Sequence, residues 1–187
     1  MEQIIRSKYR PEIDGLRGVA VLTVILNHFN KNILPGGYLG VDIFFVISGY
    51  VITSSLAWRS SNNLKEFISG FYERRIRRLV PVLVVFVFIT SIAICFFNAS
   101  PGVSLQTGLA SLFGVSNIFL LNQSTDYFAP STQLNVFTHT WSLGVEEQFY
   151  ILFPLIAWFS GFGRKTKNGV RNFFLLISAL SVVSFLG

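Results

Sequence analysis

The sequence is poor in charged residues and in cysteine. Of its 187 residues only 13% are Asp, Glu, Lys or Arg, whereas soluble globular domains carry about 25%. A soluble chain of this length could not cover its surface with so little charge. Of all residues, 51% are apolar and 16% are aromatic. This composition also excludes a disordered chain. The sequence therefore predicts a protein that lies in lipid.

The single cysteine, Cys95, lies in an apolar run. One cysteine excludes an intramolecular disulfide framework and a multi-cysteine metal site. Glycine-rich phosphate loops and nucleophile elbows are also missing from the sequence. His28, His139, Asp42 and the glutamates could be combined into a metal site, but their spacing does not support one. We expect no metal.

The basic residues cluster at the ends of long uncharged segments. The net charge is +6, yet no Lys or Arg occurs between Leu79 and Gly163, where the only acids are Asp126, Glu146 and Glu147. A nucleic-acid-binding protein would spread its cations over one face, so we expect no nucleic-acid partner. Cations that bracket uncharged runs are typical of membrane proteins, whose orientation they set.

Apolar segments of membrane-spanning length account for most of the chain. A spanning helix needs about 20 mainly apolar residues at a rise of 1.5 Å each. Five segments qualify, the last of them cut short: residues 13–29, 39–56, 79–97, 141–158 and 170–187. The sequence therefore predicts an all-α, polytopic transmembrane bundle of about five spans.

Charge asymmetry predicts the orientation. With a cytoplasmic N-terminus, two spans return the chain to the cytoplasm at residues 59–78, which carry six cations and two acids. If residues 104–121 also crossed, the cations after Gly163 would lie outside, against the same rule. We therefore predict a re-entrant or interfacial segment at 104–121, with a full crossing as the alternative. Residues 64–79 are predicted to form an amphipathic helix on the inner surface.

Ionisable residues within apolar spans mark candidate sites, because each costs on the order of 2.5 to 3.5 kcal/mol on insertion scales. Arg17 and His28 are eleven residues apart, a spacing that returns them to nearly the same helix face about 16 Å apart. Asp14 precedes Arg17 by three residues and can pair with it. Alternatively, Arg17 extends to the inner headgroups and His28 caps the outer helix end.

Two further groups of charge are candidates. Glu146 and Glu147 point about 100° apart on one helix, so they do not share a partner and at least one should face the interior. The densest cations are Arg74, Arg75, Arg77 and Arg78. These arginines either anchor the topology at anionic lipid or bind an anionic cofactor through bidentate hydrogen bonds to phosphate.

Four strings carry a family resemblance, in order and spacing. They are YRPEIDGLRGVAVLTVILNHF, LPGGYLGVDIFFVISGYVIT, FYERRIRRLVPVL and YFAPSTQLNVFTHTWSLGVEEQFYILFP. Together they resemble the acyltransferase-3 family of bacterial membrane O-acyltransferases. The similarity is closest to the branch that is often fused to an extracytoplasmic SGNH hydrolase-like domain.

The resemblance implies that acyl groups, usually acetyl from acetyl-CoA, are carried across the bacterial cytoplasmic (inner) membrane. The acceptors would be hydroxyls of envelope carbohydrates such as lipopolysaccharide O-antigen, exopolysaccharide or peptidoglycan. The family's Arg-x10-His motif falls on Arg17 and His28, and its arginine-rich motif, which would hold the CoA phosphates, falls on residues 74–78. Its HTWSLxVEEQFY motif falls on residues 139–150. For the carbohydrate site we expect Trp141, His139, Asp14 and Asp42.

The resemblance also implies a mechanism. CoA docks at the inner arginines, its thioester reaches between the first and fourth spans, and Arg17 orients the donor. His28 serves as general base or as acyl carrier, with Glu146 or Glu147 holding its tautomer.

The family's membrane domain usually has about ten helices, so residues 1–187 are expected to be a partial acyltransferase-3 domain, truncated on its C-terminal side. Its partners would be the bilayer, acyl-CoA, the carbohydrate acceptor, and an SGNH domain or the remaining helices. Two rival hypotheses are a transporter or flippase-like carrier, in which the intramembrane charges form a path, and an inactive fragment.

Overall fold

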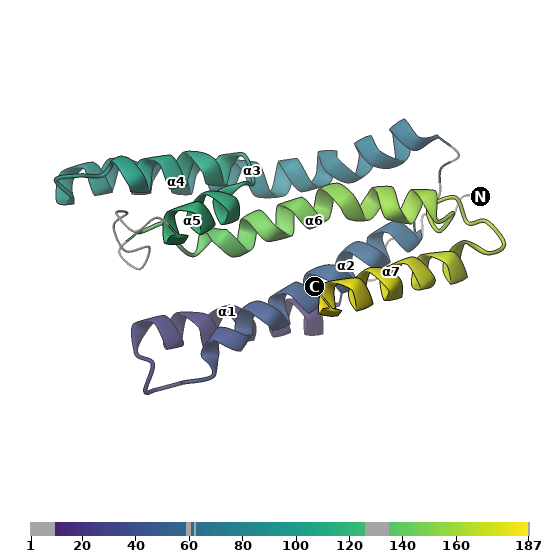
Figure 1. Cartoon of the computed structure of the whole chain (residues 1–187), viewed down its shortest axis with the longest axis horizontal. Coiled ribbons are helices and arrows are strands. Elements are labelled where there is room, and N and C mark those ends of the chain that lie inside the picture. The colour runs from purple at the N-terminus through teal and green to yellow at the C-terminus, as the bar shows by residue number, and fades with distance from the viewer. Residues whose placement is uncertain (1–9, 59–60, 62, 126–134, 187) are drawn as a thin grey trace.

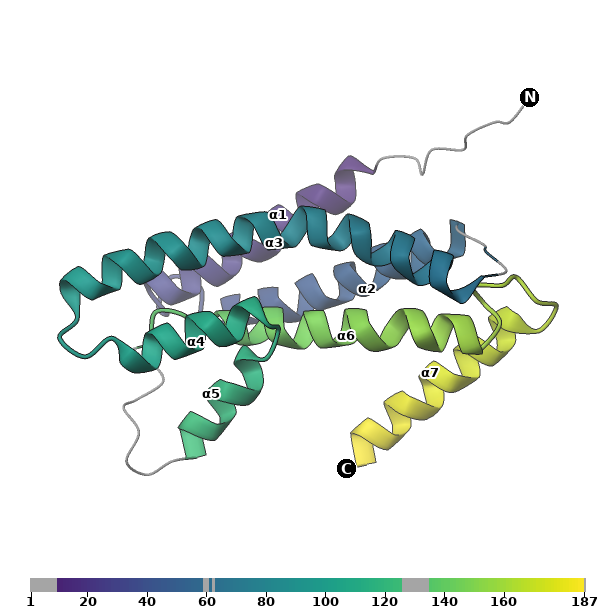
Figure 2. The same ribbon diagram turned by 90° about the horizontal axis from the view of Figure 1, so that it is seen from above.

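The structure is a computed structural model that describes residues 10–58, 61, 63–125 and 135–186. All regular elements in these ranges are helices, which confirms the predicted all-α class. They are α1 (Pro11–Phe29), the short 3-10 helix η1 (Gly37–Leu39), α2 (Gly40–Trp58), α3 (Leu64–Phe97), α4 (Gly102–Leu112), α5 (Ser116–Thr125), α6 (Thr140–Phe159) and α7 (Gly169–Leu186). Helices α1, α2, α3 and α6 run roughly along the long axis of the molecule (Figures 1 and 2).

Helices α1, α2, α6 and α7 match four predicted spans to within two residues at each end, and the second half of α3 covers the fifth. Within the described ranges, three segments are long and apolar enough to cross a membrane, namely Gly37–Trp58, Leu64–Phe97 and Gly169–Leu186. Helices α1 and α6 have comparable lengths of 19 and 20 residues. Helices α1 and α6 are less apolar than these three segments because they contain ionisable residues, among them Arg17 on α1 and Glu146 and Glu147 on α6.

Helix α3 corrects one prediction. Residues 64–79 do not form a separate surface helix, because α3 continues as one helix of 34 residues through Pro81. The Asn63 side chain begins it by accepting a hydrogen bond from the Lys65 backbone N–H at 2.9 Å. Proline lacks an N–H and crowds the carbonyl four residues earlier, and the helix bends between its two halves (Figure 2). At about 51 Å, α3 is longer than the hydrocarbon core of about 30 Å.

Residues 104–121 are split between two short helices. Helices α4 and α5 have 11 and 10 residues, so α4 extends over only about 16 Å. The turn between them contains Gly114, whose φ of +68° is favourable only for glycine. Helix α4 packs against α3 and α5 against α6. This arrangement agrees with a re-entrant or interfacial segment and excludes one straight crossing helix.

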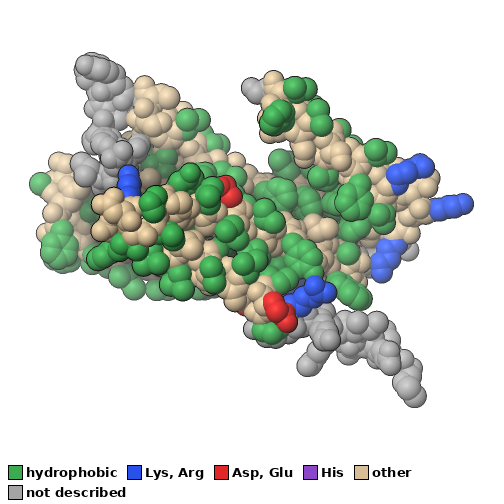
Figure 3. Space-filling model, turned by 90° about the horizontal axis from the view of Figure 1, so that it is seen from below, with side chains coloured by type: hydrophobic (Ala, Val, Ile, Leu, Met, Phe, Trp, Pro, Cys, Tyr) green, Lys and Arg blue, Asp and Glu red, His purple; other side chains and the backbone are tan. Residues whose placement is uncertain are grey.

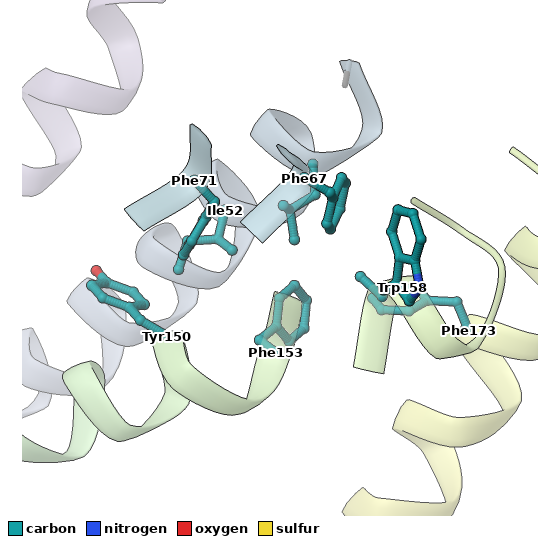
Figure 4. Close-up of a cluster of buried hydrophobic side chains, with 9 residues drawn as sticks. Ile52, Phe67, Phe71, Tyr150, Phe153, Trp158 and Phe173 are labelled. Atoms are coloured by element: carbon teal, nitrogen blue, oxygen red, sulfur yellow. The ribbon is translucent and has the colours of Figure 1, made fainter. Parts of the chain in front are cut away.

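The main apolar cluster joins α2, α3, α6 and α7 (Figure 4). Its buried members are Ile52, Leu56, Phe67, Phe71, Tyr150, Phe153, Ala157, Trp158 and Phe173. The rings of Phe67 and Trp158 lie 5.3 Å apart, and those of Phe153 and Phe173 5.5 Å apart. Because lipid is as apolar as these side chains, the cluster stabilises the bundle through close packing more than through escape from water.

Helices α1 and α2 approach each other closely at two glycines. A Cβ atom on Gly40 would meet the Ala20 carbonyl oxygen, and one on Gly37 would meet the Thr23 carbonyl oxygen. Asn27 supports the connection by donating from Nδ2 to the Leu34 carbonyl at 2.8 Å. These contacts set the distance between the helix that carries Arg17 and His28 and the rest of the bundle.

The outer surface is largely apolar. Large side chains on α1, α3 and α7 are exposed, for example Leu22 at 59%, Phe88 at 65% and Val183 at 68%. On the face shown in Figure 3 hydrophobic side chains predominate, and Lys and Arg gather mainly at one end. Such a surface suits lipid or further apolar helices.

Candidate active site

The four clustered arginines are not equivalent. Only Arg75 is partly buried, whereas Arg74, Arg77 and Arg78 are exposed on α3. The Arg75 guanidinium lies over the Tyr150 ring, 4.7 Å from its centroid, and 5.7 Å from the centroid of Phe71. Arg77 instead pairs with Glu73 on the surface, with Nη2 and Oε1 2.9 Å apart. Arg75 is therefore the arginine that α3 presents to α6.

Glu146 is buried on α6 with 6% of its surface exposed. Its Oε1 accepts a hydrogen bond from the Tyr150 hydroxyl. Arg75 is near enough to attract the Glu146 carboxylate, but neither residue belongs to the two ion pairs found among the described residues. Tyr150 therefore lies between the two charges and contacts both.

Glu147 has different surroundings, as the predicted divergence of the two side chains requires. A Cβ atom on Gly114 would meet Glu147 Oε2, so the carboxylate lies against the turn between α4 and α5. The next residue, Gln148, donates from Nε2 to the Gly114 carbonyl at 3.1 Å and to Asn117 Oδ1 at 2.8 Å. Asn117 Nδ2 donates back to Gln148 Oε1 at 3.2 Å. These polar contacts fasten α5 to α6.

Arg17 faces the interior of the bundle. Its side chain is 14% exposed, and Nη1 lies 3.8 Å from Asp14 Oδ1, which confirms the expected pair. The guanidinium lies 5.9 Å from the ring centroid of Phe44 on α2. The Arg17 Nε atom is buried and has no hydrogen-bond partner in the described part of the chain. Arg17 and Arg75 are close enough to repel each other, so two cations from different helices converge.

His28 is exposed at the end of α1, and its ring is oriented by the backbone. Its Nδ1 lies 2.9 Å from the Val24 carbonyl oxygen. In a neutral imidazole this contact requires Nδ1 to carry the proton, which leaves the lone pair on Nε2. We expected a glutamate of the fourth span to hold this tautomer. The structure corrects that expectation, because the Val24 carbonyl holds it and Glu146 bonds to Tyr150.

His139 lies directly before α6 and near His28. The edge of the Phe86 ring packs on it, with ring centroids 5.5 Å apart. Partial burial lowers the pKa of His139, and the proximity of His28 lowers this pKa further. The two histidines are far apart in the sequence, and only the structure shows that they lie near each other.

The structure does not bring the remaining predicted residues together. Trp141 packs edge-on against Phe45 of α2 at 6.4 Å, whereas Asp14 and Asp42 are exposed. A cavity of about 170 Å³ opens between α2 and α6. It is lined by Phe45, Ser48, Val145, Glu146 and Phe149.

A second cavity, of about 290 Å³, follows one face of α3. It is lined by Arg78, Leu79, Val82, Leu83, Phe86 and Leu143. It leads from an arginine at one end to Phe86, the ring that contacts His139. The structure thus provides an apolar groove between the arginines and the histidines.

Comparison with known proteins identifies the family. A family model described as an acyltransferase domain matches residues 10–187. The chain belongs to this acyltransferase family. The O-acetyltransferase OatA of Staphylococcus aureus strain NCTC 8325 is 36% identical over 177 residues, which cover 94% of this chain and 29% of that protein. A putative O-acetyltransferase, SAS0844, of strain MSSA476 is 39% identical over 152 residues, 81% of this chain and 25% of that protein.

The acyltransferase chain therefore spans less than a third of the length of these relatives. No solved structure gives a significant match to it. Membership in the family agrees with the resemblance carried by the four sequence strings, and the long apolar helices agree with a multi-pass membrane protein.

Sequence reasoning did not single out Tyr150 as a candidate site residue. Its distance of four residues from Glu146 was a usable signal, because residues at that spacing share a helix face. The contact with Arg75 had no such signal, since the two residues are 75 positions apart. Buried Ser48, which lines the cavity beside Glu146, also carried no signal in the sequence.

Proposed function

We propose that this chain forms part of a membrane O-acetyltransferase that moves acetyl groups from cytoplasmic acetyl-CoA to hydroxyls of envelope carbohydrate. The observation that carries the proposal is that Arg17 of α1 and Arg75 of α3 both turn toward other helices and lie near each other, while His28 at the end of α1 lies near His139 at the start of α6. Family membership and the names of the relatives support the acetyl group. The donor and the acceptor are our own assignment.

The arginines suit the anionic end of acetyl-CoA. Arg75 makes no hydrogen bond within the described ranges, so its N–H groups are available to phosphate oxygens, and Arg binds such oxygens bidentately. Arg77 and Arg78 add positive charge on the exposed face of α3. The apolar groove from Arg78 to Phe86 suits the less polar arm that links the phosphates to the thioester.

His28 suits the transfer step. Its Nε2 lone pair can take the proton of the acceptor hydroxyl while the oxygen attacks the thioester carbon. The new C–O bond forms, the C–S bond breaks, and the proton passes from the imidazolium to the departing thiolate. The cationic Arg17, whose buried Nε has no hydrogen-bond partner in the described part of the chain, would orient the acyl donor together with Arg75.

The orientation follows from the same assignment. Arg75, Arg77 and Arg78 lie on the first half of α3, and His28 lies at the opposite end of α1 from the N-terminus. A cytoplasmic N-terminus would place the arginines near the CoA pool and His28 toward the envelope, in agreement with the Lys and Arg distribution. We propose the bacterial cytoplasmic membrane as the location.

Release of free CoA thiol tests the proposed activity. Membrane vesicles that contain the chain would be incubated with acetyl-CoA and a glycan acceptor, and the thiol would be titrated. We expect thiol release that requires both the acceptor and Arg75. Lys31→Ala, an exposed change in the loop after α1, is the control and should not alter the rate. Acceptor movement without thiol release would instead support a transporter.

A further inference from the structure

We infer that Tyr150 is a positioning residue that holds Arg75 by the face of its ring and Glu146 by its hydroxyl, so that the edge of the Arg75 guanidinium stays open for phosphate. The inference rests on the proposed function and adds a residue to it. Its basis is the arrangement of Arg75, Tyr150 and Glu146 across the interface of α3 and α6.

The contact with Arg75 uses the face of the Tyr150 ring. The guanidinium carbon lies 4.7 Å from the Tyr150 centroid and 5.7 Å from the Phe71 centroid. The five N–H donors of an arginine project from the edge of its planar group, and a cation over an aromatic ring leaves them free. A direct pair with Glu146 would occupy two of these donors. Placing Tyr150 between the charges avoids this.

The contact with Glu146 satisfies a buried carboxylate. Glu146 and Tyr150 are 6% and 5% exposed, and the Tyr150 hydroxyl donates to Glu146 Oε1. A buried carboxylate without a hydrogen bond or counter-charge is strongly unfavourable. Tyr150 supplies the hydrogen bond, and Arg75 supplies the opposite charge at longer range. The orientation of Glu146 toward the cavity between α2 and α6 therefore depends on the Tyr150 hydroxyl.

Tyr150 is itself held in place. The Phe71 ring packs edge-on against it at 6.5 Å. Tyr72 donates from its hydroxyl to the backbone carbonyls of Tyr150 at 3.3 Å and Ile151 at 3.1 Å. In Figure 4 the Tyr150 hydroxyl points away from the apolar cluster, while its ring lies at the cluster's edge. A ring fixed by packing and by its backbone can fix two charged partners in turn.

Two substitutions separate the two contacts. Tyr150→Phe keeps the ring but frees the Glu146 carboxylate to pair with Arg75, so the dissociation constant for acetyl-CoA should rise by roughly 3- to 10-fold. Tyr150→Leu removes the ring contact as well and should raise that dissociation constant by roughly 10- to 100-fold. Tyr50→Phe is the matched control, because it deletes the hydroxyl of an exposed tyrosine on α2, outside the interface of α3 and α6. The dissociation constant should change there by no more than about twofold.

A double-mutant cycle tests whether the hydroxyl acts through Glu146. If it does, Tyr150→Phe should not weaken acetyl-CoA binding in a Glu146→Gln background, because no carboxylate remains to pair with Arg75. Additive losses would overturn the inference, and so would an equal rise in the dissociation constant for Tyr150→Phe and Tyr150→Leu. Monodisperse chromatography in detergent would establish that each variant folds. Failure of the parent chain to bind acetyl-CoA would refute the proposed function itself, whereas binding that neither Tyr150 variant affects would refute only the role of Tyr150.

Discussion

The close approach of α1 and α2 makes a strong prediction about Gly40. Gly40 has helical dihedral angles, φ −57° and ψ −30°, so alanine there introduces no backbone strain. Its Cβ would nevertheless collide with the Ala20 carbonyl oxygen and with Thr23 Oγ1 and Val24 Cγ2. A backbone carbonyl cannot move aside by a change of rotamer, so Gly40→Ala must push the two helices apart.

The size of this effect can be estimated against a control on the same helix. Overpacking costs about 1 to 3 kcal/mol, and Gly40, as the first residue of α2, gains little of the helix propensity that alanine has in a helix interior, so Gly40→Ala should lose ~1 to 3 kcal/mol. Gly49→Ala on α2 meets nothing within 4 Å and should be neutral or slightly stabilising. At about 2 to 4 °C per kcal/mol, the Tm values of the two variants should differ by several degrees.

Thermal unfolding in detergent, followed by tryptophan fluorescence, measures this difference. The expected order of Tm is Gly49→Ala equal to or above the parent chain, and Gly40→Ala clearly below it. Because Arg17 packs against Phe44 across the same helix pair, Gly40→Ala should also weaken any activity that needs Arg17. Equal Tm values for the two alanine variants would refute the close α1–α2 packing.

Three other predictions concern the candidate site and its support. Arg75→Ala should raise the KM for acetyl-CoA by tenfold or more, and Arg77→Ala, an exposed change, by less than about threefold; steady-state assays with both variants check the ranking, and the reverse ranking would contradict it. Since the pKa of His139 is lowered, the unfolded chain binds its proton more readily, so stability should fall as pH drops below about 6.5. The Tm of His139→Asn should depend less on pH in that range, and an unchanged pH dependence would count against the lowered pKa. Gln148→Ala and Asn117→Ala each break the reciprocal amide pair and should lower stability by about 1 to 2 kcal/mol, with the double variant less destabilised than the sum; additive losses would argue against the pair.

The helices that the sequence predicted well are those whose signal is local. Long apolar runs with one charged residue each, Asp42 and Arg171, identify α2 and α7. The scarcity of other polar residues identifies α1 and α6 despite Arg17 and the glutamates. The polar residues within 104–121 predicted that this segment is not one spanning helix, but they did not predict a break at Gly114. The positive φ of Gly114, at which α4 ends and the chain turns into α5, is not evident from the local sequence.

The errors arose where distant segments decide the outcome. Residues 64–79 were expected to form a surface helix of their own because their apolar side chains and their cations fall on different helix faces. Packing against α6 through Phe67 and Phe71 instead keeps α3 continuous across the proline. The same packing selects Arg75 from four neighbouring arginines, because only its position on the helix faces Tyr150. The Val24 carbonyl that orients His28 could be foreseen from i to i−4 geometry, but an exposed histidine gives no reason to look for it.

The O-acetyl content of envelope polysaccharide tests the central claim most directly. Proton NMR would be applied to cells that produce this chain, its His28→Ala variant, or neither, with the amount of inserted protein matched by immunoblot. The account predicts O-acetyl signals with the parent chain and none above background with His28→Ala, because Nε2 of His28 accepts the hydroxyl proton. Equal O-acetyl content with the parent chain and with His28→Ala would contradict it.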